Sequence, residues 1–205
     1  WGDTHLHTNL SFDANSFGGN KKLGPDEAYR FARGETVITN SGMKAKLRRP
    51  LDFLVVADHG MNLGLIADLE AAEPTLLKTD QGRELFKQLR AARVNTADKN
   101  HYPTNFLNKI FSGNSINDLS YGKSVWDRVI ANAERHNDPG KFTAFIGYEW
   151  TASPQDLAGA HLHRVVIFRD GTEKVKQVLP FTSFDSRRPE DLWSYMAAYQ
   201  TKTGG

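Results

Sequence analysis

The sequence contains no cysteine among its 205 residues. Disulfide bonds and thiolate metal ligands are therefore excluded, and His, Asp and Glu remain as the strong metal-binding side chains. The formal net charge is only +2, which gives no indication of nucleic-acid binding through bulk electrostatics. The chain also lacks an apolar run long enough to cross a bilayer. We therefore expect neither a nucleic acid nor a membrane as its partner.

The composition is that of a globular protein, with 39% hydrophobic and 24% charged residues. The length is sufficient for a sizeable core, so we expect residues 1–205 to form a single domain. Because the sequence begins with Trp1 instead of Met, we expect it to be a processed or excised part of a longer protein. The absence of cysteine favours an exported bacterial protein, while a cytoplasmic location stays open. The sequence predicts no oligomeric state.

Four short stretches rich in β-branched and apolar residues are predicted as strands, at residues 2–8, 51–58, 142–150 and 163–168. Two of them contain the continuous apolar runs FLVVA and FTAFI, which are typical of strands covered on both faces in a parallel sheet. Helical patterns occupy residues 24–34, 63–94, 124–137 (with Ser124 as the N-cap) and 188–200. This alternation predicts an α/β fold with mostly parallel strands.

Two stretches have no helical or strand pattern. Residues 95–123 are polar and irregular, and they are too long for a plain connection, so we predict an insertion loop that covers part of the molecule. Residues 16–24 contain two adjacent glycines, which allow a loop beside the opening motif.

Candidate metal ligands gather at the predicted strand ends, where ligands collect in α/β folds with parallel sheets. Alternation along the first strand places its two histidines on one face and Leu6 on the other. Five of the seven histidines in the chain lie at such ends. The candidates are His5, His7, Asp58, His59, Glu149, His161 and His163, and Asp13 follows the first pair closely.

This mixture of imidazole and carboxylate suits Zn, Mn or Fe, and Glu149 can bridge two ions where imidazole cannot. Two bridged ions roughly 3.5–4 Å apart activate a shared water and stabilise the attacking and leaving oxygens of a displacement at phosphorus. The chain has no GxSxG elbow and no GxxxxGK[ST] loop that would indicate other chemistry. The set as a whole therefore predicts a hydrolase that uses metal-activated water.

Each motif alone also has a structural interpretation. The two opening histidines can be hydrogen-bonded at the surface, Asp58 can cap the segment that follows it, and Glu149 can pair with an arginine. We interpret His101 and His136 as non-ligands, since the latter lies near a helix C-terminus where an imidazolium is favourable. The basic stretches at residues 21–24 and 44–50 are interpreted as solvated faces.

The motifs DTHLHTNLSFD and FLVVADHG, a strand ending in Glu, and a His leading into a strand resemble the PHP (polymerase and histidinol phosphatase) superfamily of metal-dependent hydrolases. The more similar branch is the bacterial domain-of-unknown-function 3604 family, which shares the Glu-Trp pair and the HR.VIF strand. The resemblance covers residues 1–169. It implies a distorted (β/α)7 barrel with two or three divalent ions at the carboxyl ends of the strands.

The resemblance also implies roles for the candidate residues. His5 and His7 bind one ion, and Glu149 bridges. His59 is the ligand of the Asp-His pair, and Asp58 orients His59 or a catalytic water, so that Asp58 and Glu149 are the expected catalytic residues. Two further assignments complete the set: Asp13 as a ligand or the support of one, and His163 as the next ligand with His161 as its alternate.

The chain departs from the family pattern after His163, because no further histidine follows and the superfamily has later ligands. We therefore expect the N-terminal part of the barrel. The predicted activity is hydrolysis of a small-molecule phosphate mono- or diester. The alternatives are hydrolysis of a sulfate ester or an amide, or a non-catalytic metal-binding barrel that binds a ligand or partner.

Overall fold

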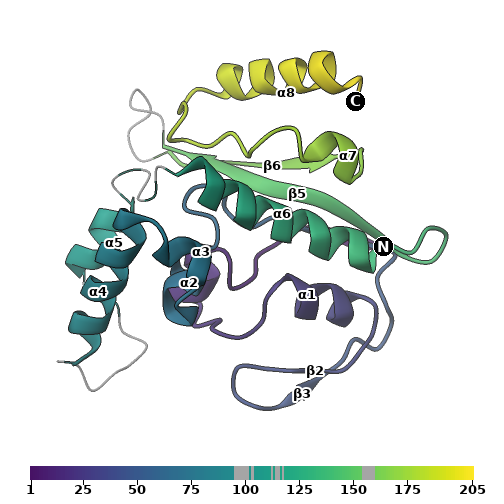
Figure 1. Cartoon of the computed structure of the whole chain (residues 1–205). Coiled ribbons are helices and arrows are strands. Elements are labelled where there is room, and N and C mark those ends of the chain that lie inside the picture. Colours follow the sequence, from purple (N-terminus) through teal and green to yellow (C-terminus); the bar gives the residue numbers. More distant parts are fainter. Residues whose placement is uncertain (95–101, 103, 112, 114–115, 117, 154–159) are drawn as a thin grey trace.

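The computed structural model describes residues 1–94, 102, 104–111, 113, 116, 118–153 and 160–205 (Figure 1). Its main feature is a curled sheet of four strands in the order β1-β4-β5-β6, which has the form of half a barrel. The strands are β1 (Gly2–Leu6), β4 (Phe53–Val56), β5 (Thr143–Ala152) and β6 (Leu162–Phe168). A separate two-stranded ribbon joins β2 (Val37–Ile38) to β3 (Lys44–Ala45). The expected α/β class is confirmed at this level.

The strands of the sheet are mostly parallel, as expected, and the fourth strand is the exception. Strands β1, β4 and β5 are parallel, but β6 runs antiparallel to β5 over the whole length from Ile146↔Phe168 to Ala152↔Leu162. The connection between β5 and β6 spans residues 153–161, which is shorter than the dozen or more residues of a parallel crossover. The chain therefore turns back on itself at this edge of the sheet.

Helices α1 (Pro25–Ala32) and α6 (Leu119–His136) cover one face of the sheet (Figure 1). Helix α1 begins with Pro25 at its first turn, and the carboxylate of Glu27 accepts a hydrogen bond from the backbone N–H of Gly24. The core under these helices includes Trp126 and Tyr148, whose rings meet edge to face with centroids 6.0 Å apart. Burying these large side chains stabilises the sheet against the helices.

The segment predicted as helical at residues 63–94 forms three separate helices. These are α2 (Leu65–Ala71), α3 (Pro74–Leu77) and α4 (Asp80–Val94). The first break follows from Ala72, which has the left-handed φ of 53°, and from Pro74, which begins α3 because its ring fits only the first turn. Binary patterning does not locate such a break, since the apolar spacing continues through it.

Two expectations about the middle of the chain are corrected. Helix α6 begins at Leu119 instead of residue 124, because the carboxylate of Asp118 accepts hydrogen bonds from the backbone N–H groups of Ser120 and Tyr121, and Ser124 lies inside the helix. Helix α5 (Thr104–Phe111) occupies part of the stretch predicted to be irregular, and residues 95–101, 103, 112, 114–115 and 117 of that stretch lie outside the described part.

A second apolar cluster joins α2, α4, α5 and the start of α6. Its centre includes Leu69, Leu89 and Ile110, which are buried, and Tyr102 stacks on Phe106 within it. The last helices, α7 (Thr172–Val175) and α8 (Pro189–Thr203), lie beyond β6 on the far side from α4 and α5 (Figure 1). Among the described residues, no helix is both long and apolar enough to cross a membrane.

Candidate metal centre

The parallel strands bring the first three motifs together at the carboxyl ends of β1, β4 and β5. The backbone N–H of Ala57 donates to the carbonyl of Leu6 at 2.8 Å, so the segment after β4 continues alongside the end of β1. Beyond it, the N–H of Glu149 donates to the carbonyl of Asp58, and His59 and Glu149 form a parallel bridge. Because this pairing persists past the end of β4, residues far apart in the sequence lie side by side.

The antiparallel strand supplies the fourth motif. His163 in β6 pairs with Thr151 in β5, and Glu149 precedes Thr151 by two residues on the same face. A parallel strand would have placed its first residues at the opposite edge of the sheet. The turn-back therefore carries the start of β6 to the carboxyl end of β5, where the other candidate ligands lie.

Glu149 is the centre of the cluster. Its side chain is fully buried, and four imidazoles surround its carboxylate. Its Oε2 lies 2.9 Å from His7 Nε2, 3.2 Å from His5 Nε2 and 3.2 Å from His59 Nδ1. Its Oε1 contacts His163 Nδ1.

Asp13 approaches the cluster from another direction. It begins η1 (Asp13–Phe17), a single π-helical turn directly after the opening motif. Its Oδ2 lies 3.0 Å from His7 Nδ1 and 3.5 Å from His59 Nε2. The two ring nitrogens of His7 therefore face two different carboxylates, Asp13 on one side and Glu149 on the other.

Three overlapping groups of side chains in the described part of the chain could each hold a metal ion. Within each group the ligand atoms lie within 4.8 Å of one another. The groups share members, so that Glu149 belongs to two of them and so do His7 and His59. A carboxylate common to two groups is the arrangement in which one side chain bridges two ions. The groups are His5, His7, Glu149; His7, Asp13, His59; and His59, Glu149, His163.

The polar atoms at the centre fit a metal better than they fit each other. His7 Nε2 and Glu149 Oε2 are both buried, and neither has a hydrogen bond of acceptable geometry to a described residue although they are 2.9 Å apart. Unsatisfied buried polar atoms are rare in native proteins and call for an explanation such as a bound ion. Nitrogen and oxygen ligands of this type suit a divalent transition metal.

The electrostatics of the cluster without an ion point the same way. Burial disfavours a charged His7, but the neighbouring carboxylates of Asp13 and Glu149 outweigh this and raise the pKa of His7 to about 10. Burial also disfavours a charged Glu149, but the surrounding histidines lower the pKa of this carboxyl to about 2. The concentrated negative charge therefore holds a proton on His7 in the place where a cation would otherwise bind.

Asp58 belongs to none of the ligand groups among the described residues. Its carboxylate is buried and accepts hydrogen bonds from the backbone N–H and the hydroxyl of Thr8, the residue after His7. Its side-chain hydrogen bonds in the described part of the chain come from Thr8, and the orientation of His59 or of a water by Asp58 stays a prediction. Burial raises the pKa of Asp58 to about 6. The geometry makes it a support of the turn that follows β1.

The structure separates the two candidates that the sequence left open at the start of β6. His163 contacts Glu149 and belongs to a ligand group, whereas His161 is exposed and lies 3.0 Å from the hydroxyl of Ser153. His161 belongs to none of the ligand groups among the described residues. The geometry therefore favours His163 as the ligand.

Sequence reasoning missed two hydroxyl groups that hold the ligands. Ser11 is buried, donates a hydrogen bond to Asp13, lies 3.3 Å from His7 Nδ1 and accepts a bond from the backbone of His59. Thr151 Oγ1 lies 2.7 Å from His59 Nδ1. For Thr151 the sequence signal is its spacing, because it stands two residues after Glu149 and therefore shares its face of the strand.

Of the two histidines that the sequence set aside, His136 is described by the structure and is in none of the ligand groups. His136 is in the last turn of α6, and its Nε2 lies 2.9 Å from Asp26 Oδ1. His101 is outside the described residues. Lys21 corrects the expectation of a solvated face, because its ammonium lies 2.6 Å from Asn15 Oδ1 and 2.8 Å from the Tyr102 hydroxyl. It joins the loop after η1 to the second apolar cluster.

Comparison with known proteins gives one family. A family model described as "Protein of unknown function (DUF3604)" matches residues 1–205. No match was found among curated proteins or among solved structures.

Proposed function

Because the chain belongs to the DUF3604 family, whose function is not known, we propose from its own geometry that it is a metal-dependent hydrolase of phosphate mono- or diesters. One observation carries the proposal: a fully buried carboxylate, Glu149, lies among four histidines that come from three different strands or strand ends. A carboxylate shared by two groups of imidazole ligands supports a centre with more than one ion.

We also propose that the family is a branch of the PHP superfamily and that the curled sheet belongs to a (β/α)7 barrel. The support is the order of the motifs along the chain and the position of the first three motifs at the carboxyl ends of parallel strands, to which antiparallel β6 adds His163. Zn, Mn and Fe are the ions that the donor set suits.

Bound divalent ions would supply charge neutralisation at phosphorus and a water of lowered pKa. Glu149, His5 and His7 would hold one ion, and His59 with Asp13 or His163 would hold another. Ser11 and Thr151 would orient the rings and the carboxylate by their hydrogen bonds, as supporting groups do around metal sites. Asp58 would act through Thr8, by fixing the turn that carries His7.

The exposure of the ligands gives the direction of substrate access. The side chains of Glu149 and His59 are 0% and 4% exposed, whereas those of His5 and His163 are 49% and 43% exposed. One side of the cluster is therefore sealed by protein and the other is open. A phosphate group would approach between His5 and His163, with the rest of the ester outside the cluster.

The proposal is tested with the chain stripped of metal and reloaded with Mn or Zn, on matched p-nitrophenyl substrates: a phosphate monoester, a phosphate diester, a sulfate ester and an anilide. We expect turnover of at least one phosphate ester. Glu149→Gln should reduce that turnover by at least about a hundredfold, because it removes the shared carboxylate at almost constant volume. His161→Ala is the matched control and should leave it within about twofold.

The outcomes separate the alternatives. Turnover of the sulfate ester or the anilide alone would replace the phosphate substrate class. Metal binding that depends on Glu149, without turnover of any substrate, would favour the non-catalytic metal-binding barrel. Equal turnover by the wild type and Glu149→Gln would overturn the proposed site.

A further inference from the structure

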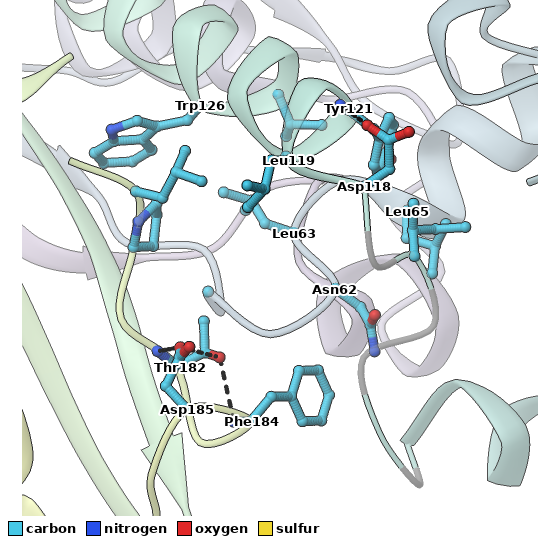
Figure 2. A pocket seen from close by; sticks show the side chains of 16 residues that line it. Asn62, Leu63, Leu65, Asp118, Leu119, Tyr121, Trp126, Thr182, Phe184 and Asp185 are labelled. Atoms are coloured by element: carbon cyan, nitrogen blue, oxygen red, sulfur yellow. Dashed lines mark hydrogen bonds between the residues drawn. The ribbon is translucent and has the colours of Figure 1, made fainter. Parts of the chain in front are cut away.

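A cavity lies outside the metal cluster, at the N-terminal end of α6 (Figure 2). Its volume is about 480 Å³, which is in the usual range of small-molecule sites, roughly 300–1,000 Å³. Three parts of the chain form its walls: residues 60–65, the first two turns of α6, and residues 179–185. None of the metal-ligand candidates in the described part of the chain lines it, although Gly60, the residue after His59, does.

Apolar side chains form about half of the wall surface of the cavity, and polar groups form the rest. Leu63, Val125, Pro180 and Phe184 line it, together with the buried indole of Trp126. Figure 2 shows side chains from the three segments facing a common space. Surfaces of this kind take up the apolar body of a ligand, since each removes apolar area from water.

One strongly exposed apolar side chain also lines the cavity. Leu119, in the first turn of α6, lines the cavity and is 77% exposed, which is high for a large apolar side chain. An apolar ligand entering the cavity would cover part of this surface.

A glycine inside α6 gives independent support. Gly122 lines the cavity at the fourth position of the helix, where glycine is less favourable than almost any other residue. A Cβ built on it would meet none of the described residues within 4 Å, so packing against them does not require glycine here. The room in front of Gly122 belongs to the cavity and is available to a ligand.

The charges around the cavity are of one sign. Asp118 and Asp185 line it, and no Lys, Arg or His does so among the described residues. The hydrogen bonds that Asp118 accepts from described residues go to its Oδ1, and those of Asp185 come from Thr182 and go to its Oδ2. Each carboxylate therefore has a second oxygen without a partner in the described part of the chain.

We propose that this cavity binds a small organic amine, with an aryl or alkyl body against the apolar walls and its ammonium group at Asp118 or Asp185. The two carboxylates attract a cation and repel an anion of the same shape, so charge and not size alone sets the preference. Gly122 leaves space for the body of the ligand beside α6.

Binding is measured by saturation-transfer NMR and by titration of tryptophan fluorescence, with phenethylammonium as the probe and 3-phenylpropanoate as its anionic counterpart of similar shape. We expect saturable binding of the amine and at least tenfold weaker binding of the carboxylate. The double variant Asp118→Asn, Asp185→Asn should remove most of this preference. Asn keeps the N-cap of α6, so the variant is expected to fold.

Gly122→Leu tests the location. The leucine should fill the cavity and weaken amine binding at least tenfold, while the melting temperature stays the same or rises because glycine is replaced within a helix. Ala131→Leu adds the same side chain at an exposed position of the same helix and should bind the amine as the wild type does. No saturable amine binding, equal binding of both probes, or unchanged binding by Gly122→Leu would each overturn the proposal.

Discussion

The shared position of Glu149 predicts that metal stabilises the protein and that this one side chain carries most of the effect. The change is Glu149→Gln, which keeps the shape and removes the charge from a carboxylate that lies 2.9–3.2 Å from three imidazole nitrogens. Loss of a group that merely supports a metal ligand costs about 10–100-fold in affinity, so loss of a shared ligand is expected at the upper end, about 100-fold.

This affinity converts into a measurable melting temperature. At a metal concentration 100 times the wild-type Kd, binding adds about 2.7 kcal/mol to the free energy of unfolding. For a chain of 205 residues, each kcal/mol raises the melting temperature by roughly 2–4 °C, so the wild type should gain about 5–11 °C. At the same concentration the variant is at its own Kd, where the gain is about 0.4 kcal/mol, or roughly 1 °C.

The assay is thermal unfolding followed by circular dichroism, with and without Zn or Mn, after removal of metal by a chelator. His163→Ala should also reduce the metal-dependent gain, whereas His161→Ala should retain it, because only the former belongs to a ligand group. A gain in Glu149→Gln equal to that of the wild type would refute the assignment of Glu149 as the shared ligand.

Three further predictions concern the supporting residues and the protons. Thr151→Val should weaken metal binding by about 10–100-fold with little change in the unliganded protein, measured by competition with a chelating dye, since it removes the hydroxyl beside His59. Because the pKa of His7 is raised to about 10 without metal, the ring holds a proton at pH 7 that a metal must displace. Affinity should therefore rise with pH between 6 and 9, and calorimetry in two buffers of different ionisation enthalpy should show proton release. Asp68→Ala breaks the buried ion pair with Arg128 and should lower the free energy of unfolding in urea by about 2 kcal/mol. This is less than the 3–5 kcal/mol of a fully buried pair, because Arg128 is 42% exposed.

The residues of the cluster were largely predictable because their spacing follows strand geometry. A histidine, a spacer and a histidine share a face at period 2, and the ends of parallel strands lie at one edge, so His5, His7, His59 and Glu149 were expected together. The same reasoning could not choose between His161 and His163. Both share a face, and only the register of β6 against β5 decides which one lies beside Glu149.

The direction of β6 and the breaks in the helices were not predictable from patterning. A continuous apolar run such as VVIF predicts a strand but does not indicate whether that strand is parallel or antiparallel to its neighbour. The direction depends on the length of the connection before it. The boundaries at Ala72 and Asp118 depend on single backbone angles and hydrogen bonds, which override the apolar period. The role of Thr8 as the partner of Asp58 depends on contacts across the sheet that no local motif records.

The way the ligands are distributed over the sheet has a kinetic consequence. His5 belongs to β1, His59 and Glu149 meet where β4 and β5 pair, and His163 belongs to β6, so every strand pairing must form before all ligand groups exist. Contacts between residues so distant along the chain form late, because closing long loops costs entropy before the contacts stabilise the fold. A metal ion therefore captures the finished sheet and does not nucleate it. The rate at which a refolding chain takes up metal therefore reports the rate of the last strand pairing. Pairing of β5 with β6 is the step that completes the ligand group around His163.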